Sequence, residues 1–230
     1  MKIHILHGLQ GARNACGIAV VIDVFRAFSL ECYMYARNAT KIIPCGTVEE
    51  AFSMKLRHPG YLLAGERNGV MVEGFDYGNS PSQFEALDLT GKSIIHTTSA
   101  GVQGLVAASH AQEVVTGALC NASAVANYIL SQNPENVSLV AMGWNGVKQT
   151  EEDILCAKYI RSIIEGNPMA DIREKALALR EQEGKKFFDP SRQSVFPERD
   201  FWLCTKVDVF DHVIHIDYKD EVISTHWAKH

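Results

Sequence analysis

The sequence predicts an α/β protein: a single compact domain, residues 1–230, with a largely parallel or mixed β-sheet flanked by helices. Short apolar runs rich in β-branched residues alternate with segments of helical periodicity, which is the pattern of βαβ units. A chain of 230 residues is long enough to bury a substantial core. No internal repeat, low-complexity tract or linker interrupts it, so one domain is expected.

The predicted strands are the short apolar runs. The run at residues 18–22 is unbroken and β-branched, so it predicts a strand buried on both faces. In chain order, strands are expected at residues 1–8, 17–24, 41–45, 61–64, 92–97, 113–117 and 137–142. Between them, helices are expected at residues 26–38, 47–56, 101–110, 121–130 and 150–164. Thr47 and Glu50 have the spacing of a capping box, which marks the start of the second helix.

The other segments are predicted to be irregular or peripheral. They are a polar loop at residues 8–16, a long loop with a brief hairpin at 68–81, a charged helical segment at 168–183 and a polar irregular segment at 184–197. The helical segment at 168–183 is expected to be an exposed insertion or a helix–helix connection, and residues 168–197 together an exposed insertion. Residues 200–216 should contain a short helix and a strand, and residues 221–225 a final hairpin partner.

Composition excludes several classes of partner. The formal net charge is −5 and no basic run is present, so neither nucleic acid nor an anionic membrane is expected to bind. No apolar window reaches the roughly 18 residues of a membrane span, and the N-terminus is too short in apolar residues for a signal peptide. The six cysteines are scattered without a CxxC pair, which predicts buried thiols in the cytoplasm. A homodimer is expected only because soluble enzymes commonly form one.

Three carboxylates occupy similar places in the predicted strand pattern. Asp23 and Glu66 each end a strand, and Asp76 lies in the glycine-rich loop just beyond. If the strands are parallel neighbours, these side chains converge at one sheet edge, where α/β proteins bind ligands. Oxygen ligands without a His/Cys cluster favour Mg²⁺. The alternative is a pair of structural salt bridges, Asp23 with Arg26 and Glu66 with Arg67, although neighbours on a strand point to opposite faces.

A second set of residues is suited to binding an anion. Arg26 and Arg67 offer bidentate donors, and the turn Thr97, Thr98, Ser99 before Gly101 opens a helix with hydroxyls and backbone N–H groups. Plain helix capping is the alternative for that turn.

Four further polar residues are interpreted first as structural. Glu152 and Asp153 lie in the first turn of a helix, where acids are expected from capping by Thr150 and from the helix dipole. Asn79 and Ser80 precede a proline, as turn residues do. Trp144 is predicted to be a packing residue.

Six segments, in order along nearly the whole chain, resemble the 2-phosphosulfolactate phosphatase family. They are VVIDVFRA (20–27), AGER (64–67), GFDYGNSP (74–81), TTSAG (97–101), EDILCA (152–157) and FWLCTKVDVFD (201–211). The resemblance implies a compact α/β fold and Mg²⁺-dependent release of phosphate from 2-phosphosulfolactate, on a route to coenzyme M.

The resemblance also implies roles for the singled-out residues. The catalytic set is Asp23, Arg26, Glu66 and Arg67; the substrate-binding set is Thr97, Thr98, Ser99, Gly101, Asn79 and Ser80; the metal set is Asp23, Glu66, Asp76, Glu152 and Asp153.

Two turns depart from the family pattern. Ala100 and Val102 stand where the family usually has Asn and Thr, and Phe28 and Ser29 where it usually has two threonines. Each lost polar contact to a substrate is worth roughly 1–3 kcal/mol. The alternative function is therefore a non-catalytic relative that binds small anions. A generic nucleotide-binding domain is less favoured, because the sequence has neither GxxxxGK[ST] nor GxGxxG.

Overall fold

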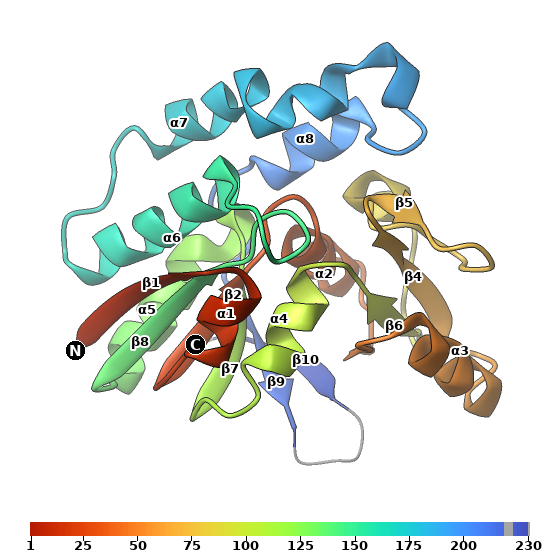
Figure 1. The fold of residues 1–230 in the computed structure, drawn as a ribbon, viewed down its shortest axis with the longest axis horizontal. Helices are drawn as coiled ribbons and strands as arrows, with labels where there is room; N and C mark the ends of the chain where they lie inside the picture. The colour runs from red at the N-terminus through yellow and green to blue at the C-terminus, as the bar shows by residue number, and fades with distance from the viewer. Residues whose placement is uncertain (219–222, 230) are drawn as a thin grey trace.

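The computed structural model describes residues 1–218 and 223–229, and in them the strands form two sheets (Figure 1). The six-stranded sheet has the order β1 (Lys2–His7), β8 (Asn136–Ala141), β2 (Ile18–Ile22), β7 (Glu113–Gly117), β9 (His212–Asp217) and β10 (Ser224–Lys229). The four-stranded sheet has the order β3 (Lys41–Pro44), β6 (Ser93–Thr97), β4 (Leu62–Arg67) and β5 (Val70–Met71). The α/β class is confirmed, whereas the division into two sheets was not predicted.

Most strand pairs are parallel. β1, β8, β2 and β7 pair in parallel with one another, as do β3, β6 and β4. β9 pairs antiparallel with both β7 and β10, and β5 pairs antiparallel with β4. All five residues of β2 are buried, as its apolar run predicts. The mixed character follows from β9 and β10, which close one edge of the larger sheet.

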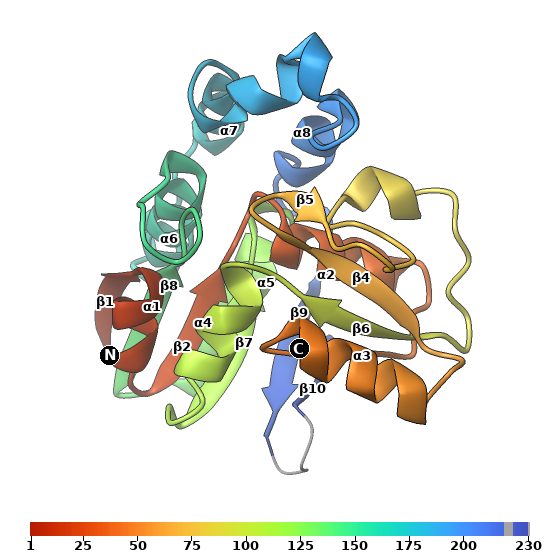
Figure 2. The same cartoon turned by 45° about the vertical axis from the view of Figure 1, so that its right-hand side comes forward.

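Helices cover both faces of the larger sheet and separate it from the smaller one. α5 (Ala122–Gln132) and α6 (Glu151–Ile164) pack on one face; α1 (Gly8–Arg13) and α4 (Gly101–Ala107) pack on the other. α2 (Ala27–Ala36) is buried on almost all sides, because Phe28 packs into the core of the larger sheet and Leu30 into that of the smaller one (Figures 1 and 2). α2 is thus the joint between the sheets.

α3 (Val48–Arg57) covers the smaller sheet and begins at the predicted capping box. The backbone N–H of Glu50 donates to Thr47 Oγ1, and the backbone N–H of Thr47 donates to Glu50 Oε2, both at 3.1 Å. The brief hairpin predicted within residues 68–81 is β4–β5, in which Glu66 pairs with Met71. β4 continues to Arg67, so Glu66 lies within the strand rather than after it.

Two regions differ from the prediction. Residues 8–16 contain the short helix α1 instead of a loop, and Gly8 begins it with a φ of +59° that suits glycine. Residues 168–197 contain α7 (Ile172–Ala178) and three 3₁₀ turns, and they are not simply exposed, since Phe187 and Phe196 are buried in the main core. These three turns are η3 (Leu179–Glu181), η4 (Glu183–Phe188) and η5 (Pro190–Arg192), and α8 (Glu198–Cys204) follows them. Two further 3₁₀ turns, η1 (Pro81–Phe84) and η2 (Leu119–Asn121), lie earlier in the described chain.

The remaining predictions have mixed outcomes. Residues 221–222 of the hairpin partner predicted at 221–225 lie outside the described residues, while Ser224 and Thr225 begin β10, which pairs antiparallel with β9 as predicted. The six cysteines are free thiols, five of them buried and Cys16 exposed. None of the helices in the described part of the chain combines the length and the apolarity that a bilayer crossing requires.

Candidate active site

Asp23 and Glu66 meet in one cavity between the two sheets. Asp23 follows β2 of the larger sheet, and Glu66 lies near the end of β4 of the smaller sheet. The strands are therefore not the parallel neighbours that the sequence suggested, yet both side chains line the same space. That cavity is about 30 Å³, the volume of a water molecule or a single ion.

Asp23 is held at the start of two helices. Its Oδ1 accepts a hydrogen bond from the backbone N–H of Ala27 at 3.2 Å, at the beginning of α2. Its Oδ2 lies against Gly101 of α4, where an added Cβ would come within 2.9 Å of it. Burial raises the pKa of Asp23 to about 6, and the negative charge of Glu66 adds to the rise. A nearby cation would relieve both effects.

Glu66 is fixed by three donors. Its Oε1 accepts from the backbone N–H of Ser99 at 2.6 Å, while Oε2 accepts from the backbone N–H of Gly69 at 2.6 Å and from the Ser99 hydroxyl at 3.1 Å. Gly65 precedes it where a Cβ would approach the carbonyl oxygen of Thr97 to 2.1 Å, so only glycine permits this strand contact. Glu66 does not form the salt bridge with Arg67 that was the structural alternative: Arg67 donates instead to the backbone carbonyl of Glu66 at 2.7 Å.

Arg26 does not pair with Asp23. Its Nη1 donates to Asp200 Oδ2 at 2.7 Å and to the carbonyl of Val195 at 2.9 Å, and Nη2 donates to the carbonyl of Gly69 at 3.3 Å. The guanidinium also lies 4.9 Å from the ring centre of Phe196. The structural alternative from the sequence, a salt bridge between Arg26 and Asp23, is therefore wrong, because the partner of Arg26 is Asp200. Both terminal nitrogens of the Arg26 guanidinium donate to groups of the protein itself.

Asp153 and Glu152 are two further buried carboxylates, in the first turn of α6. Asp153 accepts from the backbone N–H groups of Val24 at 2.8 Å and Gly143 at 2.7 Å, which ties together the chain after β2 and β8. The predicted side-chain cap between Thr150 and this helix is absent. Glu152 Oε2 is buried without a hydrogen-bond partner in the described part of the chain, and burial raises the Glu152 pKa to about 7. Neither acid is among the described residues that line the cavity, but Asp153 fixes the backbone at Val24 and Gly143, beside Asp23 and the cavity wall.

Comparison with known proteins places the chain in one family. The 2-phosphosulpholactate phosphatase family model matches residues 3–219. A Bacillus subtilis (strain 168) protein named "Probable 2-phosphosulfolactate phosphatase" is 33% identical over 225 residues, 96% of each chain. Proteins with the same name from Thermotoga petrophila and Clostridium perfringens (strain 13 / Type A) are 34% and 32% identical, over 86% and 90% of this chain and 88% of their own. The chain belongs to the 2-phosphosulpholactate phosphatase family. The resemblance inferred from the six segments is confirmed.

In this member of the family, Asn79 lines the cavity and Ser80 stands behind it. Asn79 Oδ1 lies 3.3 Å from His96 Nε2, and His96 Nδ1 lies 2.8 Å from Glu31 Oε1, with Glu31 and His96 fully buried. The hydroxyl of Ser80 donates to Asp200 Oδ1 at 2.9 Å. These two residues are therefore more than turn formers, since each is held by a buried network.

The three hydroxyl residues of the turn before α4 make different contacts. Thr98 Oγ1 accepts from the backbone N–H of Val102 at 3.0 Å, as a helix cap does. Thr97 is fully buried, and its Oγ1 accepts from Arg67 Nη2 at 2.9 Å. Of the three hydroxyl residues, Ser99 is the one that lines the cavity, where its backbone N–H donates to Glu66. Ala100 beside it also lines the cavity, with a methyl group.

Asp76 lies elsewhere. Its Oδ2 accepts from the backbone N–H of Leu63 at 2.8 Å and is 3.6 Å from Lys55 Nζ, near the opposite end of β4 from Glu66. The side chain is 40% exposed. The structure therefore does not bring Asp76 together with Asp23 and Glu66.

Reasoning from the sequence missed two charged residues. Asp200 is fully buried and joins Arg26 to Ser80. Lys186 has its Nζ among aromatic rings, and the charges of Glu152, Arg26 and Asp23 act on it. The sequence did contain a signal for Lys186: Phe187 and Phe188 follow it directly, which indicates burial within the segment that we had interpreted as polar and irregular.

The carboxylates fit Mg²⁺ as an open site. In the described ranges, 1–218 and 223–229, no group of three His, Cys, Asp or Glu side chains is arranged to hold a metal ion. Mg²⁺ is commonly held by one or two carboxylates, with water and substrate phosphate completing the octahedron. Asp23 and Glu66 offer such a pair, and the hydrogen bonds on Glu66 are of the kind that orient a ligand.

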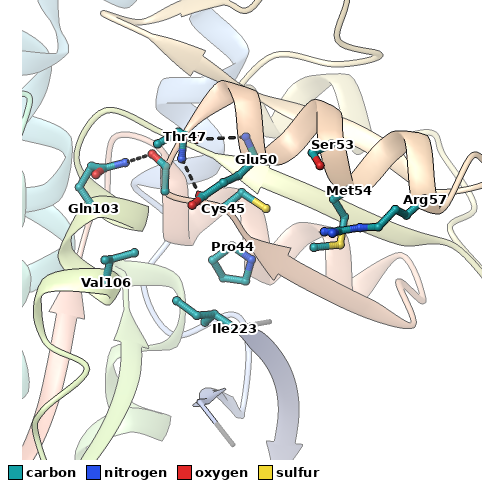
Figure 3. Close-up of a pocket in the computed structure, with 11 residues that line it drawn as sticks. Pro44, Cys45, Thr47, Glu50, Ser53, Met54, Arg57, Gln103, Val106 and Ile223 are labelled. Carbon is teal, nitrogen blue, oxygen red and sulfur yellow. Dashed lines mark hydrogen bonds between the residues drawn. The ribbon is translucent and has the colours of Figure 1, made fainter. Parts of the chain in front are cut away.

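Two larger hollows lie nearby. A groove of about 490 Å³ shares Ser99 and Asn145 with the small cavity and is also lined by Arg67. A cavity of about 550 Å³ between α3 and α4 shares Gly46, Thr47 and Gln103 with that groove but no residue with the small cavity (Figure 3). The latter contains none of the predicted site residues, and its Thr47 and Glu50 are engaged with each other in the capping box. We therefore identify the candidate site between the sheets by the carboxylates that line it and not by its volume.

Proposed function

We propose that this protein hydrolyses a small anionic phosphomonoester in a Mg²⁺-dependent reaction, with 2-phosphosulfolactate as its substrate. Water and the ester would give 3-sulfolactate and inorganic phosphate. Membership of the 2-phosphosulpholactate phosphatase family supports this reaction class, and several relatives carry the activity in their names. The proposal includes the cytoplasmic location and the role in coenzyme M biosynthesis that the resemblance implies.

The observation that carries the proposal is the meeting of Asp23 and Glu66 in one small cavity. Burial, and the charge of Glu66, raise the pKa of Asp23, so a charged Asp23 is costly here unless a cation or a proton lies with it. Mg²⁺ held by Asp23 and Glu66, with Glu152 or Asp153 as further acids, would neutralise phosphate oxygens and lower the pKa of a bound water. The site is ready for such an ion because its oxygens are already oriented.

The protein's own groups would position and activate the reactants. Asp23 is the candidate for direct chemistry, as a general base that takes a proton from water or as a nucleophile that accepts the phosphoryl group. A carboxyl with a pKa of about 6 suits proton transfer near neutral pH. Glu66 cannot swing away, because its two oxygens are tied to Ser99 and Gly69.

The adjoining groove would hold the rest of the substrate. Its volume of about 490 Å³ is sufficient for a small organic acid, and Arg67 lines it. With the phosphoryl group at Asp23, a second anionic group would reach the Arg67 guanidinium. Ala100 replaces a polar side chain of the family pattern at the cavity wall, so selectivity for the sulfonate would rely on the Arg67 side.

Phosphate release from a panel of phosphomonoesters, with Mg²⁺ and with EDTA, tests the proposal. The expected result is Mg²⁺-dependent release from 2-phosphosulfolactate, abolished by Asp23→Asn. Release from other acids only would retain the chemistry and overturn the substrate. No release from any ester, combined with tight binding of a phosphorylated acid, would favour the non-catalytic anion-binding alternative.

A further inference from the structure

Lys186 is a cation near the candidate active site to which the proposed reaction assigns no role. It belongs to η4, in the segment between α7 and α8 that arches above the end of β2 (Figures 1 and 2). The neighbouring Lys185 is exposed, whereas Lys186 is half-buried. The two lysines thus differ in environment although they are adjacent and chemically identical.

Aromatic rings from three parts of the chain surround the Lys186 ammonium. Its Nζ lies 5.0 Å from the ring centre of Trp144, 5.4 Å from that of Phe196, 5.5 Å from that of Phe187 and 5.7 Å from that of Phe25. Phe25, Trp144 and Phe196 also line the cavity of Asp23 and Glu66. Lys186 is not itself a lining residue, but these three rings connect its ammonium to the wall of the cavity. The π-faces satisfy none of its three N–H donors as an oxygen would.

Among the residues that the structure describes, Lys186 has no oxygen partner. Across the described residues, its Nζ has neither a hydrogen-bond acceptor nor an ion-pair partner within 4 Å. The charges of three carboxylates, Glu152, Glu183 and Asp23, nevertheless act on it, opposed by that of Arg26. A partly desolvated ammonium without an acceptor is costly, so an arrangement that keeps it there points to an anionic ligand.

The other cation beside the cavity is already engaged. Arg26 donates to the Asp200 carboxylate and to two backbone carbonyls, so its charge is largely balanced within the protein. The cavity side otherwise carries the carboxylates Asp23 and Glu66, with Glu152 close to Lys186. A phosphate dianion brought there would meet strong repulsion unless a second positive group accompanied the metal ion.

We propose that Lys186 binds the phosphoryl group of the substrate, donating from its caged ammonium to phosphate oxygens at the Asp23 end of the cavity. The inference rests on the proposed function only for the identity of the ester. Inorganic phosphate, the common product of such esters, should bind through the same contact. The aromatic cage makes the ammonium a preorganised donor, so little side-chain ordering accompanies binding.

The test compares Lys186→Met, Lys186→Arg and the matched control Lys185→Met. Methionine has a similar length and packs well against aromatic rings, so Lys186→Met should fold with an unchanged or higher thermal midpoint. Titration calorimetry with inorganic phosphate in the presence of Mg²⁺ gives Kd directly, and phosphate-release kinetics give KM and kcat.

Lys186→Met should raise the phosphate Kd and the ester KM by roughly 10- to 100-fold, the worth of a charged hydrogen bond. Lys186→Arg should recover part of the loss, and Lys185→Met should match the wild type. Unchanged phosphate Kd and KM in Lys186→Met would overturn the inference, as would absence of phosphate binding to the wild type. A wild type that binds phosphate through Lys186 yet hydrolyses no ester would overturn the proposed function alone.

Discussion

Arg26 and Asp200 form a buried ion pair, with Arg26 Nη1 at 2.7 Å from Asp200 Oδ2 and the side chains 3% and 0% exposed. The pair joins the start of α2 to α8 across 174 residues of chain. The second Asp200 oxygen accepts from the Ser80 hydroxyl and from the backbone N–H of Ser82. The pair therefore fixes the loop after Asp23, the segment that carries Lys186 and the Asn79 turn relative to one another.

Asp200→Ala should destabilise the protein by about 3–5 kcal/mol, because it leaves the Arg26 charge buried without its partner. Urea denaturation measures this as a lower midpoint with an unchanged slope. Asp171→Ala is the matched control, since Asp171 pairs with Lys175 at the surface and its loss should cost at most about 0.5 kcal/mol. Similar small losses in both variants would show that the buried pair contributes no special stability.

Asp23→Asn should abolish turnover and also change how stability depends on pH. The folded-state pKa of Asp23, about 6, lies above its ordinary value of 3.8, so the native state binds this proton more tightly than the unfolded state. That contribution is present below pH 3.8 and is lost as the pH rises through 6. In EDTA, Asp23→Asn should therefore be more stable than the wild type at pH 8, by at most about 3 kcal/mol, and the difference should vanish near pH 4.

Mg²⁺ supplies the control for that measurement. A cation at Asp23 would stabilise the wild type at pH 8 by mass action and would stabilise Asp23→Asn much less. Thermal melts at several Mg²⁺ concentrations separate the two proteins. A variant that is less stable than the wild type at pH 8 in EDTA, or that responds equally to Mg²⁺, would contradict the assignment of Asp23 to the ion.

Glu66→Gln and Asp76→Asn should differ sharply, although the sequence interprets both residues as candidate metal ligands. Glu66→Gln places an amide NH₂ where an oxygen now accepts backbone donors, and we expect kcat/KM to fall roughly 100- to 1,000-fold. Asp76→Asn alters a partly exposed contact with Lys55, so activity should stay within about threefold of the wild type. Mg²⁺-dependent kinetics of both variants check this, and a large loss in Asp76→Asn would restore Asp76 to the metal site.

The comparison of Asp23 with Asp76 shows what a sequence can predict. Asp23 follows a wholly apolar run whose burial is a local property, so its place at a strand end was predictable. Asp76 is in a loop, and which end of β4 it approaches depends on how residues 68–81 fold back. The position of Asp76 relative to the cavity therefore could not be predicted from its position in the sequence.

Contacts between distant segments were also beyond prediction. The partner of Arg26 lies 174 residues away, and the two-sheet arrangement depends on β2 pairing with β7 and β8 rather than with β4. Lys186 was overlooked because the polar residues around it suggested an exposed segment, whereas Phe187 and Phe196 anchor that segment in the core.

Arg67→Met should separate recognition of the second anionic group from the chemistry. Arg67 lines the groove beside the cavity and donates to Thr97 Oγ1 and to the carbonyl of Glu66, so its guanidinium is fixed in place with donors to spare. We expect KM for 2-phosphosulfolactate to rise roughly tenfold or more, since a charged hydrogen bond is lost. KM for a phosphomonoester without a second anion should change less than threefold, and kcat should stay similar for both.

Arg67→Lys refines the same measurement, because a lysine keeps the charge but not the planar fork. It should recover only part of the affinity for 2-phosphosulfolactate if the guanidinium binds a sulfonate or carboxylate through two donors. Steady-state kinetics with the two esters, run side by side on the three proteins, give the comparison. Equal losses for both esters in Arg67→Met would instead mean that Arg67 supports the reacting end of the site, through its contact with the backbone of Glu66.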